Sequence, residues 1–384
     1  MNHKSSKKIL IEGNSLFQKR TGVGQYTKRL FESLARLDKK NKYTFFAFLF
    51  AGKKLPQDPI KANNVNYQYV RYIPGRVYNK ILKAKINLKI DKILGGNTDL
   101  FIFPNFVAWP TSKSARVWSI IYDASYLEHP EYSDKKNRDY LIKFVGKTVE
   151  RSEKIITISQ NAKKEIENHY PLSKNKIEII SPAVDYKEYF PKNKTEVTKV
   201  INKYGIDKNY ILYTGTLEPR KNILGILEGY SALPKNILSS YTLVLAGGKG
   251  WLDEEIEEKL AELKELNIIR TGYVADEDLP ALYSGATVFV YPSFYEGFGM
   301  PPLEAMACGT PVITSNNSSL PEVVGEAGIM IDAKDTGALT KSIEKVISSK
   351  KLQNEMIKKG IVQAKKFSWE ESAKKLYELI QSIE

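Results

Sequence analysis

The chain has 384 residues, of which 42% are hydrophobic and 27% charged. This length suits two domains rather than one core, and the composition is globular rather than disordered or fibrous. One cysteine (Cys308) excludes a disulfide framework and a thiolate metal site, and three scattered histidines do not favour a histidine metal site. The basic first residues lack a long apolar stretch, and no run of about 18 apolar residues follows. We therefore expect neither a signal peptide nor a membrane span, and a cytoplasmic location.

The positive charge is concentrated in one half of the chain. Residues 1–190 hold 35 Lys and Arg against 18 Asp and Glu, a net of +17, whereas residues 191–384 hold 23 against 26, a net of −3. Such asymmetry indicates that the first half meets something anionic. Nucleic acid, an anionic membrane surface and a phosphorylated acceptor all fit, and a merely lysine-rich surface is the alternative.

Short apolar runs alternate with helical patterns along the whole chain. In the first half we predict strands at 7–13, 43–50, 100–103, 117–122, 154–158 and 176–180, and helices at 22–34, 140–152 and 161–169. In the second half we predict strands at 210–214, 242–246, 268–270, 288–291 and 312–314, with helical patterns at 221–232, 253–265, 276–285, 301–308 and 335–366. A final helical spacing covers 367–383. This alternation predicts an α/β fold with two doubly wound parallel-sheet domains facing across a cleft, and ligands at the carboxyl ends of the strands.

The stretch from Glu296 to Glu304, EGFGMPPLE, lies between a predicted strand and a predicted helix. Two prolines suit the first helical turn, and glycines let the backbone approach a ligand closely. Both glutamates would then face the same mouth of the sheet, and free amides at the helix start can bind hydroxyls or phosphate oxygens. A glycine-rich loop with solvated glutamates is the alternative reading.

Two further strand-to-helix loops carry ligand-binding chemistry. Gly215 begins GTLEPRKN, in which Arg220 and Lys221 would lie at the carboxyl edge of the sheet and stabilise a departing diphosphate. A basic pair solvated at a helix start is the alternative. In TGVGQY, Gly22 and Gly24 form an incomplete phosphate-binding fingerprint, for which a plain turn remains an alternative.

These three stretches together resemble the retaining GT-B glycosyltransferases of family 4, whose signature is E-G-F-G-x-P-x-L-E-A-M-A-x-G-x-P-V; this chain reads EGFGMPPLEAMACGTPV. The resemblance implies two Rossmann-like domains, 1–187 on the acceptor side and 188–368 on the nucleotide-sugar side. It also implies that the last helix, 369–384, packs back on the first domain. The reaction implied is metal-independent transfer of a hexose with retention, from a nucleotide-diphosphate sugar and without another cofactor.

The resemblance also assigns roles to matching positions. Glu304 would hold the donor ribose, and Glu296 would contact the transferred sugar, helped by backbone amides. Arg220 and Lys221 would bind the diphosphate, and Gly22 and Gly24 would approach it from the other domain. The donor-binding positions implied are Glu304, Gly22, Gly24, Gly215, Phe298, Gly299, Met300 and Leu303.

One departure lies at Tyr122-Asp123, where many relatives have His-Asp. Either Tyr122 takes over the histidine's place, or Asp123 alone shapes the site, or the alignment is shifted; we keep Asp123 as a catalytic candidate. A second region, 76–94, interleaves lysines with apolar residues at helical spacing, which is typical of a helix on an anionic membrane surface. An ordinary surface helix is the alternative.

The form EPRKN resembles mannosyltransferases of bacterial polysaccharide assembly, so GDP-mannose is the predicted donor, with a UDP-hexose as the alternative. The expected acceptor is a saccharide or a lipid-linked saccharide, with possible peripheral contact with the inner face of the membrane. Two other classes stay open: a nucleic-acid-binding protein, although no nucleic-acid module is recognised, and a non-catalytic scaffold that binds a sugar nucleotide. We expect no nucleic-acid partner.

Overall fold

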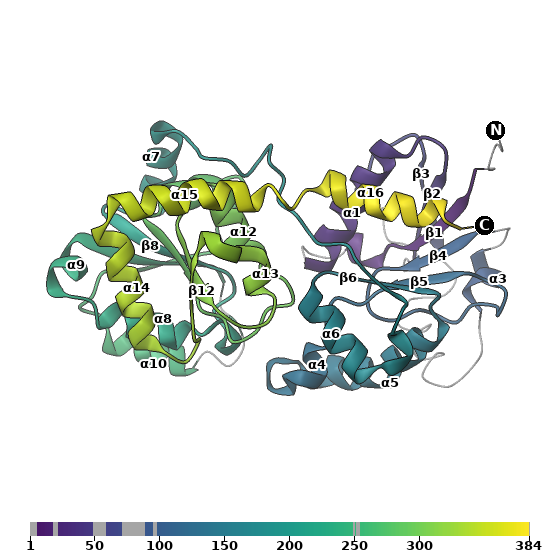
Figure 1. Ribbon diagram of the computed structural model, residues 1–384, viewed down its shortest axis with the longest axis horizontal. Helices are drawn as coiled ribbons and strands as arrows, with labels where there is room; N and C mark the ends of the chain where they lie inside the picture. The colour runs from purple at the N-terminus through teal and green to yellow at the C-terminus, as the bar shows by residue number, and fades with distance from the viewer. Residues whose placement is uncertain are drawn as a thin grey trace. The chain divides into compact units, whose positions relative to one another are not determined.

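The computed structural model describes residues 6–17, 22–48, 59–70, 89–94, 98–248, 250 and 254–383. The chain divides into two compact units. The first comprises Met1–Pro182 with Trp369–Glu384, and the second comprises Ala183–Ser368. Each unit is built on one parallel sheet with helices packed around it (Figure 1).

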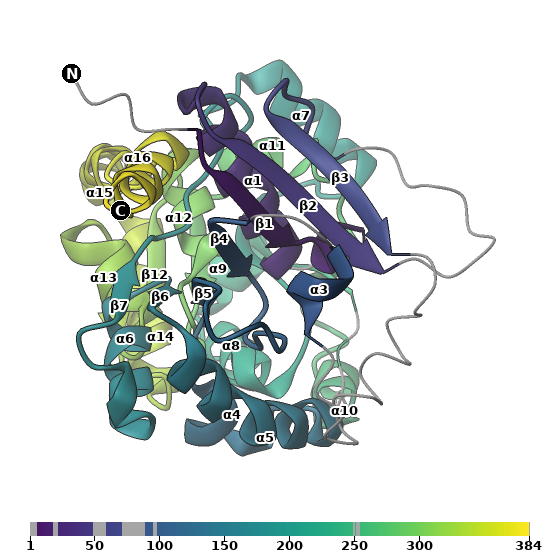
Figure 2. The same ribbon diagram turned by 90° about the vertical axis from the view of Figure 1, so that its right-hand side faces the viewer.

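The first unit has a seven-stranded sheet in the order β3-β2-β1-β4-β5-β6-β7. Its strands are β1 (Lys8–Glu12), β2 (Lys42–Phe48), β3 (Val65–Val70), β4 (Leu100–Phe103), β5 (Val117–Ile120), β6 (Lys154–Thr157) and β7 (Ile177–Ile179). Its helices are α1 (Gly22–Leu37), α3 (Ile90–Leu94), α4 (Ser125–Glu128), α5 (Lys135–Arg151), α6 (Gln160–His169) and α16 (Trp369–Gln381). The arrows of β1, β2 and β3 run side by side in the same direction (Figure 2).

The last helix, α16, packs against α1 although the two are more than 300 residues apart in the sequence. The ring of Trp369 meets that of Tyr26 edge-on at 5.7 Å between centroids. Tyr26 donates a hydrogen bond of 2.7 Å to the carbonyl of Ile180, and Ser372 donates one of 2.6 Å to the carbonyl of Ser181. Aromatic packing and two backbone anchors thus hold the end of the chain on the first unit.

The second unit has a six-stranded sheet in the order β10-β9-β8-β11-β12-β13. Its strands are β8 (Asn209–Thr214), β9 (Tyr241–Ala246), β10 (Ile268–Gly272), β11 (Val288–Tyr291), β12 (Val312–Ser315) and β13 (Ile329–Ile331). Its helices are α7 (Lys194–Lys203), α8 (Ile223–Ser231), α9 (Lys235–Ser240), α10 (Glu254–Glu262), α11 (Leu279–Gly285), α12 (Met300–Ala307), α13 (Leu320–Val324), α14 (Thr336–Ser348) and α15 (Lys350–Ala364).

The predicted α/β fold with two doubly wound parallel sheets is confirmed. Two strands were not predicted, β3 and β13, and both lie at a sheet edge. β3 (VNYQYV) mixes polar and apolar residues along a mostly half-exposed strand, so it lacks the continuous apolar run of the central strands. β13 is an apolar run, but it is only three residues long, Ile329–Ile331. The single helical pattern over 335–366 is wrong as one helix. It is two helices, because Ser349 ends α14 and caps α15 by accepting a hydrogen bond from the Leu352 amide at 3.2 Å.

The predicted basic helix over 76–94 lies outside the described residues except for its last six, where α3 spans Ile90–Leu94. Among the residues that the structure describes, no helix combines the length and the apolar character needed to cross a bilayer.

Candidate active site

Two loops of the second unit meet where its strand order changes direction. β8 and β11 are neighbours in the sheet, while the chain between them runs outward through β9 and β10. The loop after β8 carries Arg220 and Lys221, and the loop after β11 carries Glu296. The amide of Phe294 donates a hydrogen bond of 2.9 Å to the carbonyl of Arg220, which joins the loops directly. Such a switch point is where parallel α/β sheets bind ligands.

The predicted cations and one predicted carboxylate form a single ion-pair network. The Nζ of Lys221 lies 2.6 Å from Oε1 of Glu296 and also donates to the hydroxyl of Tyr291 at 2.6 Å. Arg220 lies 3.2 Å from Oε2 of the same carboxylate, and its other terminal nitrogen lies 2.8 Å from Glu218. Two cations and two carboxylates therefore balance one another in the free protein.

Burial and pairing together set the ionisation of this network. Although burial by itself disfavours a charged carboxylate, Lys221 and Arg220 lower the pKa of Glu296 from 4.5 to about 2. Burial lowers the pKa of the Lys221 ammonium, although Glu296 acts in the opposite direction. Against the effect of burial, Glu296 raises the pKa of Arg220. Glu296 is therefore fully ionised at neutral pH, as its role as the counter-charge requires.

The loop after β11 is fixed by two serines at the start of α13. The amide of Glu296 donates to Oγ of Ser318 at 3.0 Å. Ser319 donates to the carbonyls of Glu296 and Phe298 at 2.8 and 2.6 Å. Gly299 precedes α12 with φ of 114°, a conformation that strongly favours glycine, and a Cβ there would lie 2.8 Å from Leu320.

The start of α12 offers backbone donors. In the described part of the chain, no hydrogen bond is formed by the amides of Phe298, Gly299 or Met300, and the next two residues are prolines, which have no N–H. Free amides at a helix N-terminus are suited to phosphate or hydroxyl oxygens. The side chain of Leu303, by contrast, is fully buried in the core.

Glu304, one turn further along α12, is half-buried and lies in a separate hydrogen-bonded pair with the buried Tyr283. Tyr283 of α11 donates to its Oε2 at 2.9 Å, and Oγ1 of Thr214, the last residue of β8, lies 2.6 Å from the Tyr283 hydroxyl. Burial raises the pKa of Glu304 from 4.5 to about 7, which the hydrogen bond from Tyr283 offsets only in part. Glu304 is therefore a carboxyl group that titrates near neutral pH.

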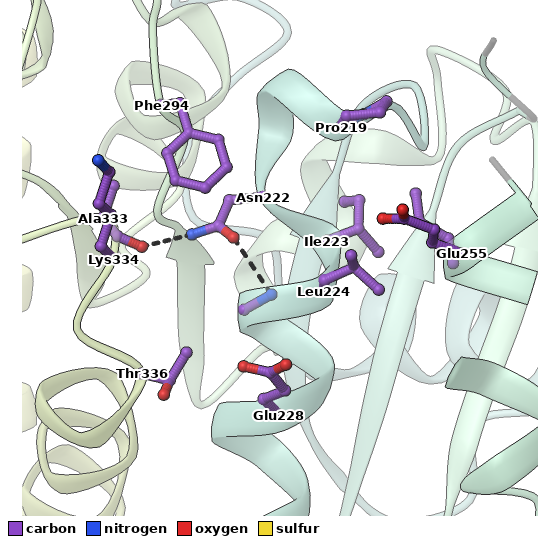
Figure 3. A pocket seen from close by; sticks show the side chains of 12 residues that line it. Pro219, Asn222, Ile223, Leu224, Glu228, Glu255, Phe294, Ala333, Lys334 and Thr336 are labelled. Carbon is purple, nitrogen blue, oxygen red and sulfur yellow. Dashed lines mark hydrogen bonds between the residues drawn. The ribbon is translucent and has the colours of Figure 1, made fainter. Parts of the chain in front are cut away.

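The turn into α8 depends on Asn222, which directly follows Lys221. Asn222 has a left-handed backbone (φ 57°) and accepts a hydrogen bond from the amide of Gly225 at 3.2 Å, so it caps α8. Its Nδ2 donates to the carbonyls of Ala333 and Pro292, at 2.6 and 3.1 Å. Figure 3 shows this side chain between α8 and the loop that carries Ala333.

A pocket of about 380 Å³ opens beside this turn, among Asn222, Leu224, Glu228, Phe294 and Thr336 (Figure 3). Neither the ion-pair network nor Glu304 lines it.

In the loop before the turn, Gly215 has φ of 138°, and a Cβ there would lie 2.9 Å from the Tyr213 hydroxyl.

The remaining predicted residues belong to the first unit. Gly22 is exposed and is the first residue of α1, and Gly24 is buried two residues later, so the predicted glycine-to-helix transition is confirmed. A Cβ on Gly22 would meet nothing within 4 Å, so the surrounding protein does not require glycine there. Asp123 is half-buried and accepts two hydrogen bonds from Ser125, at 3.0 and 2.7 Å, at the start of α4. Tyr122 is buried and donates to the carbonyl of Pro104 at 2.9 Å.

Three residues that contact the predicted site residues of the second unit were not themselves predicted. Tyr291 contacts Lys221, Tyr283 contacts Glu304, and Glu218 contacts Arg220. The sequence did carry a partial signal, because Tyr291 ends a predicted strand at the same sheet edge as Glu296. The last residue of a strand can therefore contribute a side chain to the site, as the loop that follows it does.

The fold and this site define a two-domain, GT-B-type glycosyltransferase. Residues 20–188 match the family model described as Glycosyltransferase Family 4, and residues 196–363 match Glycosyl transferases group 1. The chain belongs to this glycosyltransferase family. It is 32% identical over 375 residues to O-antigen chain mannosyltransferase B of Escherichia coli, covering 94% of this chain and 96% of that protein.

Other relatives agree in class. The serotype-specific mannosyltransferase WbdA of Escherichia coli is 35% identical over 230 residues, which is 58% of this chain and 28% of that protein. Among solved structures, sucrose-phosphate synthase from Thermosynechococcus elongatus superposes with a TM-score of 0.74 at 20% identity, covering 98% of both chains. HepE of Anabaena, in complex with UDP and glucose, superposes with a TM-score of 0.70 at 15% identity, covering 98% of this chain and 100% of that one. These two structures share the fold.

Proposed function

We propose that this glycosyltransferase transfers mannose from GDP-mannose, with retention of configuration, to a saccharide or lipid-linked saccharide acceptor on the cytoplasmic side of the membrane. The observation that carries this proposal is the cluster of half-buried Arg220 with buried Lys221 and Glu296 at the switch point of the second sheet. The similarity to a mannosyltransferase over nearly the whole chain supports the choice of mannose.

In the proposed reaction, Arg220 and Lys221 stabilise the diphosphate as its bond to the sugar breaks. Arg220 suits this because a guanidinium donates several hydrogen bonds in a fixed plane, and Lys221 adds a point charge in a desolvated place. The free amides at the start of α12 supply further donors. Because these groups supply the positive charge, the mechanism as proposed uses no metal ion. A phosphate oxygen of the donor takes the proton from the acceptor hydroxyl.

Glu296 has two parts in this proposal. In the free protein it neutralises Lys221 and Arg220, so that the buried Lys221 ammonium and the half-buried Arg220 guanidinium have a counter-charge. When the negatively charged diphosphate binds, it replaces Glu296 as the counter-charge. The carboxylate is then available to accept hydrogen bonds from hydroxyls of the transferred sugar.

The first unit bears on the choice left open at Tyr122-Asp123. The Tyr122 hydroxyl is already bonded to the carbonyl of Pro104, and its ring packs against Tyr26 edge-on at 5.5 Å. Asp123 is the more exposed of the two. This supports the reading in which Asp123, and not Tyr122, shapes the site at this strand end.

The proposal is tested by comparing GDP-mannose with UDP-hexoses as ligands and as donors. Thermal shift measures binding, and release of the free nucleoside diphosphate in the presence of a mannoside acceptor measures transfer. Stabilisation by GDP-mannose and transfer of mannose are expected. Stabilisation and transfer with a UDP-hexose instead would replace the donor but keep the reaction class, and binding of sugar nucleotides without transfer would contradict the proposed activity.

Donor binding should strengthen as the pH rises through about 7, because Glu304 holds ribose hydroxyls best as a carboxylate. With a pKa of about 7 in the free protein, the ionised fraction rises from about a tenth at one unit below to about nine-tenths at one unit above. The dissociation constant of GDP-mannose should therefore fall about tenfold between about pH 6 and about pH 8. Calorimetric titration at a series of pH values measures it.

Two variants isolate this effect. Glu304→Gln should weaken binding and remove its pH dependence over this range. Glu355→Gln, at an exposed position of α15, should leave both unchanged. Burial raises the pKa values of Tyr283 and Cys308, so these neighbours stay protonated throughout. If donor binding by Glu304→Gln still depends on pH, a group other than Glu304 causes that dependence.

A further inference from the structure

The first unit has a pocket of its own, at the edge of its sheet where β2 and β3 begin. This open pocket, of about 730 Å³, is lined by the last turn of α1, the connection into β2 and the segment that leads into β3. Gly22 and Asp123 belong to the other edge, because they follow the carboxyl ends of β1 and β5. α1 runs between the two edges, and its 16 residues span about 24 Å. The pocket is thus separate from the candidate active-site residues of this unit.

The lining of this pocket is strongly basic. Its charged side chains are all cations: Arg36, Lys39, Lys40, Lys42 and Lys61. Four asparagines supply the other polar groups, and no acidic side chain is among the described residues that line it. Ammonium, guanidinium and amide groups together suit an anion with several oxygen acceptors, such as a phosphate.

The acidic residue of this turn, Asp38, forms no ion pair with the described cations that line the pocket. Asp38 is buried, and its Oδ1 accepts hydrogen bonds from the amides of Lys40 and Asn41 at 2.9 and 3.2 Å. Its Oδ2 accepts from the Asn41 side chain at 2.7 Å and from the Tyr43 hydroxyl at 2.5 Å. The carboxylate is therefore bound inside the turn, where it fixes the backbone that presents Lys39 and Lys40 to solvent.

A second contact fixes the opposite wall of the pocket. Nδ2 of Asn64 donates to the carbonyl of Asp38 at 2.6 Å and lies 3.3 Å from that of Ala35. This ties the segment before β3 to the end of α1. The positions of the lining backbone are thus set by hydrogen bonds within the protein and do not depend on a ligand.

The cations of the pocket are little compensated. Arg36 pairs with Glu32 at 2.8 Å, but the Arg36 side chain is 60% exposed, so this surface pair is weak. Lys40, Lys42 and Lys61 are exposed and form no ion pair within the described ranges. Several uncompensated like charges around one concavity repel one another, and an anion placed among them removes that repulsion.

We propose that this pocket binds a phosphate-bearing anion. Its two possible sources are the headgroup of an anionic lipid and a soluble phosphate. Leu37, adjacent in sequence to Arg36, is 48% exposed, and an apolar side chain beside a basic pocket fits the surface of a membrane. The net charge of +17 over residues 1–190 would draw this unit toward such a surface.

The test compares two double variants that remove the same charge. Lys40→Gln with Lys42→Gln alters the pocket, whereas Lys358→Gln with Lys359→Gln alters two exposed lysines of α15 in the other unit. Binding to vesicles of phosphatidylcholine, with and without phosphatidylglycerol, is measured by co-sedimentation at low and high salt. Binding of glycerol 3-phosphate is measured by calorimetry. The pocket variant should bind the anionic vesicles about tenfold or more weakly than the wild type, and the control should not.

The two arms separate the sources of the phosphate. If only the pocket variant loses binding, and it loses binding to anionic vesicles but not to glycerol 3-phosphate, the ligand is a lipid headgroup. If only the pocket variant loses binding to glycerol 3-phosphate, the ligand is a soluble phosphate. Equal loss in both double variants, or no binding by the wild type in either arm, overturns the proposal. Both double variants should keep the wild-type thermal unfolding and the wild-type rate of transfer to a soluble acceptor, since none of the four lysines belongs to the candidate active site.

Discussion

Replacing Arg220 with alanine should lower the turnover of sugar transfer by about 10²–10³-fold, the usual effect of removing one preorganised donor from a developing negative charge. The fold should survive, because the Arg220 side chain is 24% exposed and Glu296 keeps its contact of 2.6 Å with Lys221. Steady-state kinetics with GDP-mannose measure turnover, and urea unfolding measures stability.

Arg270→Ala is the matched control for this variant. Arg270 belongs to the same unit and pairs with Glu257 at 2.7 Å, but at the surface, with both side chains about one-third exposed. Its loss should leave turnover within about twofold of the wild type. A conservative Arg220→Lys variant should recover only part of the activity, because lysine lacks the planar fork. Equal turnover in Arg220→Ala and the wild type would remove Arg220 from the reaction.

The second large effect concerns stability at the pair Lys221–Glu296. Glu296→Ala should lower the free energy of unfolding by about 3–5 kcal/mol, because it leaves the buried Lys221 ammonium without its carboxylate. Lys221 is 8% exposed, so water cannot take the place of the lost partner. Urea unfolding at neutral pH measures this loss.

The double variant Lys221→Met with Glu296→Leu separates charge burial from packing. It should recover most of the lost stability, because two apolar side chains leave no buried charge unpaired, while transfer stays abolished. If the stability lost in the double variant equals the sum of the losses in Lys221→Met and Glu296→Leu alone, the pair does not interact.

The pH dependence gives an independent check on the same pair. The pKa of Glu296 is lowered from 4.5 in its unperturbed state to about 2 in the folded protein. Its contribution to stability is therefore complete above about pH 4.5 and is lost as the pH falls toward about 2. Between these values the wild type should lose stability more steeply than the double variant, which lacks this carboxylate.

Much of the fold could be predicted because central strands of parallel sheets are buried on both faces. Leu100–Phe103 and Val288–Tyr291 were predicted with their observed bounds, since each is a short apolar run between polar segments. β3 was missed because polar and apolar residues are mixed along it, and β13 because it is a run of only three residues. The break between α14 and α15 was missed because a single serine cap interrupts an otherwise continuous helical spacing.

The candidate site also has a part that could be predicted from the sequence and a part that could not. The loops that carry Arg220, Lys221 and Glu296 could be predicted because each follows a strand, and strand ends of a parallel sheet share one edge. The sequence did not show that these three side chains pair with one another, or that Tyr291 and Tyr283 hold Lys221 and Glu304. Those contacts join residues of different strands and helices, many of them about 70 residues apart in the chain.

The sequence by itself determined the parallel-sheet architecture and the loops that carry the charged residues, because these follow from local patterns of burial, glycine and charge. It indicated the class of this protein through the resemblance of EGFGMPPLEAMACGTPV to a family signature. Only the tertiary structure decided the state of those charges. It placed Glu296 against two cations, which keeps it ionised, and it partly buried Glu304 beside Tyr283, which raises the pKa of Glu304 to about 7. The reason is physical: a pKa depends on the distance to other charges and on exclusion of water, and both are properties of the folded chain.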